Sequence, residues 1–297
     1  MKRAAVIGCA GQDGRLLVER LSRDADVVGV DAGDVDLADP DAARAWVERV
    51  EPSELYFLAA HHHSSEAAPD EAAELRACTE VHVTSWVNVL DALRRHAPAC
   101  RAFYAGSSHM FGRPTETPQS EKTPFAPRSP YAITKVAGAH VAALFRERGM
   151  HVSVGILYNH ESPLRGPQFV SQRIVRGARS AARDRSFKLV LADLSAVVDW
   201  GWAPDYVDAM IRMVRESVPD DYVVATGKAH TVRDFVANAF AAVGLDWRDH
   251  VVEDPSLPKS KTSALVGDAT KLRTRTGWSP TSTFEEMIKA LLFGDVK

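Results

Sequence analysis

The sequence has little of three features that would each assign it to a particular class of protein. It has only three cysteines, Cys9, Cys78 and Cys100, an odd number at irregular spacing. This argues against a disulfide framework, shows no metal-binding spacing and indicates a reducing compartment. No apolar run approaches the roughly 18 residues of a membrane span, and the N-terminus turns polar too soon for a secretory signal. We therefore expect a cytoplasmic protein with no membrane contact.

The third feature in short supply is net charge. Lysine and arginine number 36 against 39 acidic residues, so the formal net charge is -3 at pH 7. Without a basic field, nucleic acid is not an expected partner. Hydrophobic residues, at 45% of the 297, are ample for a packed core, and the length suits one large domain or two unequal ones.

A glycine-rich turn lies near the start of the chain, between an expected strand and an expected helix. Residues 3–8 predict a short buried strand, and residues 15–21 have helical periodicity. Between them Gly8, Gly11 and Gly14 recur every three residues. Such glycines let the backbone approach a pyrophosphate, while the helix N-terminus offers free N–H groups. The pattern predicts a dinucleotide site.

A second buried strand ends in Asp31, about 20 residues after the glycine turn. An acid there can accept hydrogen bonds from the adenosine ribose and would repel a 2′-phosphate. NAD is therefore favoured over NADP, although an ordinary turn aspartate is the alternative. Little room follows for a full third strand, so that edge of the sheet is expected to be short.

Strands and helices alternate through the first half of the chain. We expect helices at 39–50 and 71–96, and strands at 54–60, 101–105 and 152–157. This alternation predicts an α/β fold with a Rossmann-type, doubly wound parallel sheet.

From residue 158 the pattern changes to short alternating elements. We expect helices and strands at 169–183, 187–192, 204–216, 222–225 and 231–243. They predict a smaller substrate-binding α/β region over 158–297, with segments that could return to an NAD-binding Rossmann domain over 1–157. A cleft between the two would hold the substrate.

Tyr131 and Lys135 are four residues apart in an expected helix that runs to about Arg148, so they share one face. An ammonium beside a phenol favours the phenolate, so we expect the pKa of Tyr131 to fall from about 10 toward neutrality. Such a tyrosine can take a proton from an alcohol while hydride leaves the same carbon. Ser107, at the end of the strand at 101–105, can bind the same oxygen. The alternatives are that Tyr131 and Lys135 form an ordinary surface pair and that Ser107 belongs to a simple turn.

Three consecutive histidines, His61 to His63, follow the strand at 54–60. Adjacent residues do not share a face, so we expect a loop beside a cofactor and no metal site.

The glycine turn, Ser107 and the Tyr131–Lys135 pair resemble the extended short-chain dehydrogenase/reductase superfamily. Within it, four longer stretches resemble the GDP-mannose 4,6-dehydratase family: Gly11-Gln-Asp-Gly14, 118–131, Gly155-Ile-Leu-Tyr-Asn-His-Glu-Ser-Pro163 and Asp199-Trp-Gly-Trp-Ala-Pro-Asp-Tyr206. The likeness covers nearly the whole chain.

The resemblance implies a tightly held nicotinamide cofactor, a nucleotide-diphosphate sugar substrate, and a homodimer or homotetramer. Ser107, Tyr131 and Lys135 would oxidise a sugar hydroxyl, after which a carboxylate removes the C5 proton and helps to expel the C6 hydroxyl. The implied cofactor-binding residues are Gly8, Gly11, Gln12, Asp13, Gly14, Asp31, Asp36, Leu37, Ala59, Ala60, His63, Tyr131, Lys135, Tyr158, His160 and Arg165. The implied substrate-binding residues are Ser108, Asn159, Phe169, Val170, Arg173 and Lys259.

The sequence departs from the family pattern at the residue that should carry the acid/base carboxylate. His109 stands there, and histidine transfers protons near neutral pH. We expect it to serve elimination or epimerisation; the alternative is that it only shapes the pocket. Val198 and the lysines of 257–261 also replace residues that the family uses to hold its nucleotide, so the base need not be guanine.

The favoured hypothesis is an NAD-dependent nucleotide-sugar 4,6-dehydratase. The alternative keeps the fold but changes the reaction to a C4 epimerase or 4-keto reductase, which needs only Ser107, Tyr131 and Lys135. A non-catalytic dinucleotide-binding protein is disfavoured because that set is intact.

Overall fold

A six-stranded parallel sheet forms the larger part of the computed structural model, which describes residues 2–61, 70–254, 256–257 and 264–294. The strand order is β10-β5-β4-β3-β1-β2, and every neighbouring pair runs parallel. The strands are β1 (Arg3–Ile7), β2 (Asp26–Val30), β3 (Glu54–Phe57), β4 (Arg101–Ser107), β5 (His151–Leu157) and β10 (Asp221–Val224). The predicted α/β fold class is confirmed.

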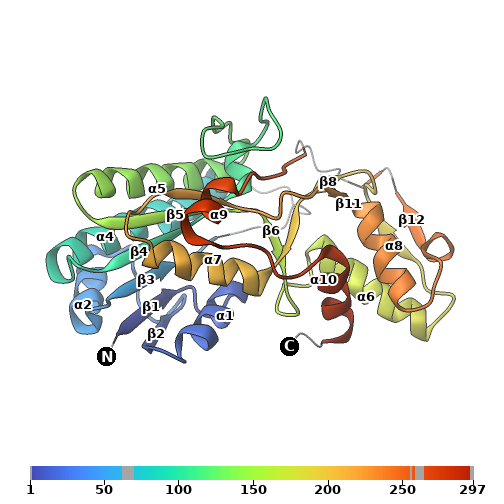
Figure 1. The fold of residues 1–297 in the computed structure, drawn as a ribbon, viewed down its shortest axis with the longest axis horizontal. Coiled ribbons are helices and arrows are strands. Elements are labelled where there is room, and N and C mark those ends of the chain that lie inside the picture. Colours follow the sequence, from blue (N-terminus) through green and yellow to red (C-terminus); the bar gives the residue numbers. More distant parts are fainter. Residues whose placement is uncertain (1, 62–69, 255, 258–263, 295–297) are drawn as a thin grey trace.

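Helices cover both faces of this sheet (Figure 1). Alternate residues of β1 enter two separate cores, Ala4 and Val6 on one face, Ala5 and Ile7 on the other. This double burial explains why the strands read as continuous apolar runs. One face is covered by α1 (Gln12–Leu21), α7 (Ala203–Arg215) and α9 (Thr270–Thr276), and the other by α2 (Pro40–Val50), α4 (Ser85–His96) and α5 (Pro130–Glu147).

The expected short edge lies at β2. The chain passes from β2 to α2 without another strand, so β2 itself is the last strand of the sheet on that side. Asp39 begins α2 by accepting hydrogen bonds from the N–H groups of Asp41 and Ala42.

The span 71–96 is helical as expected, but the prediction missed a π-helical turn within it. The structure has α3 (Glu71–Thr79), then the π-helical turn (Glu80–Thr84), then α4. Ser85 donates its hydroxyl to the carbonyl of Glu80 at 2.9 Å within this wider turn. Such turns have no sequence period of their own, and they occur often at functional sites.

The smaller part of the molecule lies beside the carboxyl ends of the strands (Figure 1). Three helices pack around one apolar core: α6 (Val170–Arg183), α8 (Val232–Ala242) and α10 (Phe284–Phe293). Short strand pairs complete it: β6 (Asn159–Glu161) with β9 (Trp200–Trp202), β7 (Leu189–Leu191) with β12 (Val251–Glu253), and β8 (Val197–Val198) with β11 (His230–Thr231). Among the described helices, none has both the length and the apolar character to cross a membrane.

Three segments after residue 158 belong to the larger part. β10 pairs with β5 at the edge of the parallel sheet, and α7 and α9 pack against that sheet. The chain therefore crosses between the two parts more than once.

Candidate active site

The glycine turn follows β1 and leads into α1. Gly8 has a φ of +88°, and a Cβ on Gly14 would lie 2.2 Å from the Gly8 carbonyl oxygen. A Cβ on Gly8 would lie 2.8 Å from the backbone nitrogen of Ala59, so the segment after β3, which continues into Ala60, packs directly on the turn. Gly11 caps α1 without a side chain that bonds its first N–H groups. These exposed donors and the close backbone fit the pyrophosphate of a dinucleotide.

Two substitutions separate the packing of this turn from ligand binding. A Cβ at Gly14 must displace backbone, so we expect Gly14→Ala to lower the free energy of unfolding by about 1–3 kcal/mol. A Cβ at Gly11 meets its nearest neighbour at 3.5 Å, an ordinary contact. We expect Gly11→Ala to keep its stability and to weaken dinucleotide binding by about tenfold or more, since the added methyl would occupy the space of the pyrophosphate. Thermal unfolding and calorimetric titration measure the two effects; equal loss of stability in both variants would contradict this assignment.

Asp31 ends β2 directly beside the glycine turn. One carboxylate oxygen accepts a hydrogen bond from the Ala10 N–H at 2.6 Å, and the other accepts from the Ala32 N–H at 2.8 Å. Each oxygen can accept a further bond, so ribose hydroxyls still have acceptors here. Asp36 and Leu37 follow in the loop before α2, where the Leu37 carbonyl accepts from Asn88 of α4 at 3.1 Å.

A charged pair, Asp13 and His160, joins the glycine turn to β6. The two ring nitrogens of His160 lie 2.9 Å from the Asp13 carboxylate and 2.6 Å from the Tyr158 carbonyl oxygen. Both neighbours are acceptors, so both nitrogens carry protons and the ring is an imidazolium. Gln12 strengthens the link, because its amide donates to the His160 carbonyl at 3.1 Å.

The pH dependence of stability tests this pair. Burial opposes the charge on each partner, but their mutual attraction lowers the pKa of Asp13 and raises that of His160. The raised pKa means that stabilisation is complete below about pH 6.5, the unfolded-state value, and is lost as pH rises through the folded-state value. The lowered pKa of Asp13 adds a second loss in strong acid.

We therefore expect the stability gap between wild type and His160→Gln to be widest between about pH 5 and 6.5 and to narrow toward pH 9. Urea unfolding at several pH values measures it. A gap that does not change with pH would show that the ring is neutral.

Ser107, Tyr131 and Lys135 come together at the carboxyl end of β4. Ser107 is the last residue of β4, while Tyr131 and Lys135 lie one turn apart at the start of α5. A hydrogen bond from Ser107 reaches the phenol of Tyr131. Lys135 is 1% exposed and donates its ammonium to the Ala105 carbonyl at 2.9 Å, with the ammonium 5.7 Å from the centre of the Tyr131 ring.

The expected fall in the pKa of Tyr131 is wrong for this geometry. Burial raises the pKa of Tyr131 to about 12, although the Ser107 hydrogen bond and the charge of Arg165 oppose the rise. Burial also lowers the pKa of Lys135 to about 7, so only part of the protein carries a protonated Lys135 amine at neutral pH. Desolvation penalises both charged forms here, and spacing in sequence cannot reveal it.

His82, in the π-helical turn, supports the helix that carries Tyr131. One ring nitrogen of His82 accepts the His61 N–H at 3.0 Å, so the other must donate, and it lies 2.8 Å from the Thr134 hydroxyl. The single hydroxyl proton of Thr134 is in turn shared between the backbone carbonyls of Pro130 and Tyr131, at 2.9 and 3.0 Å. His82 was not among the predicted site residues; its signal, a histidine within a helix, is too common to single out.

His109 lies beside Tyr131 on a short 3-10 turn, Ser108–Phe111, directly after β4. The two rings are 6.1 Å apart and nearly perpendicular, at 83°. Burial, with a further contribution from the charge of Arg165, lowers the pKa of His109. The imidazole is therefore neutral at neutral pH, the form that accepts a proton.

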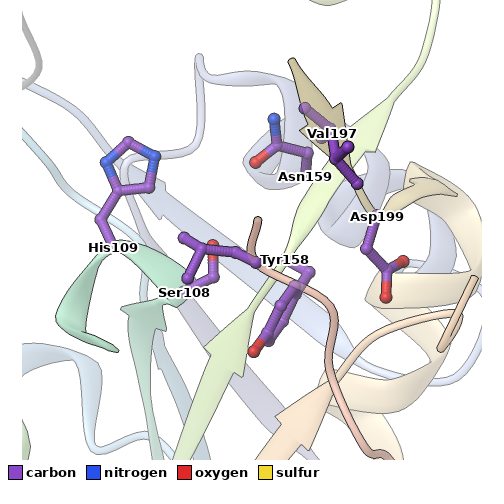
Figure 2. A pocket seen from close by; sticks show the side chains of 8 residues that line it. Ser108, His109, Tyr158, Asn159, Val197 and Asp199 are labelled. Atoms are coloured by element: carbon purple, nitrogen blue, oxygen red, sulfur yellow. The ribbon is translucent and has the colours of Figure 1, made fainter. Parts of the chain in front are cut away.

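A cavity of about 50 Å³, the catalytic pocket below, opens beside His109 (Figure 2). Figure 2 shows His109 and Asn159 reaching it from different sides, with Ser108 and Tyr158 between them. The hydroxyl of Tyr158 donates to the side-chain oxygen of Gln119 at 2.9 Å, so its proton is already engaged. The remaining lining residues are Val197, Val198, Asp199 and Leu265.

Arg165, expected among the cofactor-binding residues, lies close enough to influence both predicted acid/base groups. Its charge lowers the pKa of Tyr131 and of His109. Its guanidinium stacks 3.6 Å from the centre of the Phe169 ring, and its Nε lies 3.6 Å from the Glu161 carboxylate.

Two other predicted substrate-binding residues lie on α6. Val170 begins α6, and Arg173, one turn further, donates to the Val190 carbonyl at 3.1 Å. His63 and Lys259 lie outside the described residues.

Asp199 is a site residue to which the sequence assigned no role. It is 1% exposed, and its carboxylate accepts backbone N–H bonds from Thr226 at 3.0 Å, Gly227 at 2.9 Å and Gly267 at 3.2 Å. The Asp199-Trp-Gly stretch was visible in sequence, but its partners lie 27 to 68 residues away.

Comparison with known proteins agrees with this arrangement. The family model described as GDP-mannose 4,6 dehydratase matches residues 30–291. GDP-mannose 4,6 dehydratase 1 of Arabidopsis thaliana is 40% identical over 270 residues, covering 88% of this chain and 73% of that protein. The GDP-mannose 4,6-dehydratase of Yersinia enterocolitica is 31% identical, covering 100% of this chain and 94% of that protein.

Solved structures share the fold at lower identity. A dTDP-glucose 4,6-dehydratase of Bacillus anthracis superposes with a TM-score of 0.83 at 18% identity, over 98% of this chain and 96% of that chain. A UDP-glucose 4-epimerase of Thermus thermophilus also gives 0.83, at 23% identity, over 98% and 97%. With its glycine turn, Ser107, Tyr131 and Lys135 gathered at one sheet edge, this chain belongs to the GDP-mannose 4,6-dehydratase family, the nucleotide-sugar 4,6-dehydratases of the extended short-chain dehydrogenase/reductase superfamily.

Proposed function

We propose that His109 replaces the usual carboxylate as the acid/base group of this dehydratase, and that the enzyme uses NAD. The observation that carries the proposal is the position of a neutral imidazole beside Tyr131 at the catalytic pocket. GDP-mannose is the first substrate to test, because the relatives carry its name. Val198 in the pocket lining, where the family has an arginine, is the reason to test other nucleotide sugars as well.

The protein residues would divide the proton transfers between them. When bound, the nicotinamide supplies a hydride acceptor for the sugar C4 and a donor for C6. Tyr131 takes the proton of the C4 hydroxyl in its phenolate form, which its raised pKa makes the minor form, with Ser107 bonded to the same sugar oxygen. The neutral His109 takes the C5 proton, which the new C4 ketone has acidified. The resulting imidazolium protonates the C6 hydroxyl, which leaves as water while the C5–C6 double bond forms. Return of the hydride to C6 would then require a proton at C5, which His109 would deliver after it regains one from solvent.

Three finer assignments belong to the same proposal. Asp31, with free acceptor capacity beside the glycine turn, supports NAD over NADP. Exposed apolar side chains on the adjacent helices α3 and α5, namely Leu75, Ile133 and Leu144, support a homodimer or homotetramer. A cytoplasmic location is consistent with three free cysteines.

Product mass tests the proposed reaction. Purified protein is incubated with NAD and, in separate reactions, with GDP-, UDP-, CDP- and dTDP-sugars. We expect one product that is lighter by one water. A product of equal mass would replace dehydration by C4 epimerisation, and absence of turnover with every sugar would favour a binding protein.

A further inference from the structure

A second cavity, of about 480 Å³, lies between the two parts of the molecule and shares no lining residue with the catalytic pocket. Its walls are the segment 226–230, the segment 267–273 and the start of α10 with the residues before it, together with Pro118 and Trp200. This volume falls in the usual range for small-molecule sites, roughly 300–1,000 Å³. Nothing in the dehydration mechanism uses it.

The charged lining of this cavity is mainly basic. Two cations, Lys228 and Arg273, line it against one acid, Asp268. Asp268 is already engaged, since it accepts from the N–H of Thr270 at 2.9 Å. The ammonium of Lys228 makes no hydrogen bond or ion pair with the described part of the chain, so it is available to an anion.

Trp200 adds a buried donor without an acceptor. It is 2% exposed, and its indole N–H has no hydrogen-bond partner among the residues that the structure describes. This nitrogen has almost no accessible surface, so it is the ring of Trp200 that faces the cavity. Aromatic surface adjoins the indole of Trp200. Its ring centre lies 5.9 Å from that of Phe284, and the Phe284 ring stacks on His230 with ring centres 3.8 Å apart.

We propose that the second cavity binds a small sugar phosphate. Lys228 and Arg273 would hold the phosphate, and the apolar surface of Phe284 with the indole of Trp200 would hold the sugar ring. Cationic donors on one side and aromatic surface on the other match a ligand with a charged head and a ring of modest polarity.

Binding in the second cavity would reach the catalytic pocket through Asp199. The backbone N–H groups of Thr226, Gly227 and Gly267 bond the Asp199 carboxylate and also belong to the wall of the second cavity. Asp199 lines the catalytic pocket. A ligand that shifts these loops would therefore change the KM for the nucleotide sugar.

Calorimetric titration of the full chain with glucose 6-phosphate tests the site, with glucose and inorganic phosphate as comparison probes. We expect millimolar or tighter binding of glucose 6-phosphate. Lys228→Gln should weaken it by about tenfold, the value of one charge-assisted bond, whereas Lys228→Arg should stay within about threefold of wild type. Since the Lys228 ammonium bonds no described residue, both variants should fold normally.

Each other outcome contradicts the proposal. No binding at millimolar concentration, or binding unchanged in Lys228→Gln, would remove the site. Displacement by NAD or by a nucleotide sugar would place the anion in the catalytic site. Equal affinity for inorganic phosphate would remove the sugar from the proposal. None of these results depends on turnover, so a failure of the dehydratase assignment would be seen separately.

Discussion

Tyr131→Phe should reduce nucleotide-sugar turnover by about 10²–10⁴-fold, the usual contribution of a positioned acid/base group. The change removes one hydroxyl, the group that Ser107 bonds and that must exchange a proton with the sugar. No reduced nicotinamide should accumulate on mixing with substrate, because oxidation is the first step. Absorbance of the reduced cofactor and product mass measure both effects.

Tyr222→Phe is the matched control for this variant. Tyr222 is also buried, but it lies on β10, and its hydroxyl has no partner within the described residues. We expect it to retain wild-type turnover. If Tyr131→Phe kept more than a tenth of wild-type activity while folding normally, the redox role of Tyr131 would be wrong.

His109→Ala should separate the two halves of the reaction. In the proposed mechanism oxidation at C4 uses Ser107, Tyr131 and Lys135, so reduced nicotinamide should still form. Removal of the C5 proton should slow by about 10²–10⁴-fold, because the proposed base is lost. Incorporation of solvent deuterium at C5, followed by mass spectrometry, measures this step directly.

The pH profile of deuterium exchange adds an independent readout. The pKa of His109 is lowered, so the neutral base persists below the ordinary histidine value of about 6.5, and exchange should fall only under more acidic conditions. His109→Gln, similar in size but unable to titrate in this range, should be as slow as His109→Ala. His109→Glu, which restores the family's carboxylate, should recover exchange. Exchange at the wild-type rate in His109→Ala would show that the histidine only shapes the pocket.

Much of the larger part of the fold could be predicted because its signals are local. The glycine turn lies between a strand and a helix within 21 residues, and Tyr131 and Lys135 are held one turn apart by the helix itself. The boundaries of α2 and α5 follow from Asp39 and Ser129, whose side chains bond the first N–H groups of each helix. The division at residue 157 into cofactor and substrate regions stays a prediction, because β10 and α7 return to the sheet.

The site was harder to predict because its important contacts are distant in sequence. Asp13 and His160 are 147 residues apart, and His82 and Thr134 are 52 apart. Arg165 stays a predicted cofactor residue, and its charge also acts on His109 and Tyr131, which the sequence did not suggest. No sequence periodicity encodes such contacts, because they form between segments that follow different strands of the sheet, such as those after β1 and β5.

The sequence by itself determined most helices and strands of the larger part up to residue 157, the glycine turn and the Tyr131–Lys135 spacing, since each depends on neighbours within a few residues. Only the tertiary structure decided the protonation of the site. Burial raises the pKa of Tyr131 to about 12 and lowers that of Lys135 to about 7, and it keeps His109 neutral. Desolvation depends on every chain segment that surrounds a group, so a pattern in sequence can place an acid/base residue without revealing its charge.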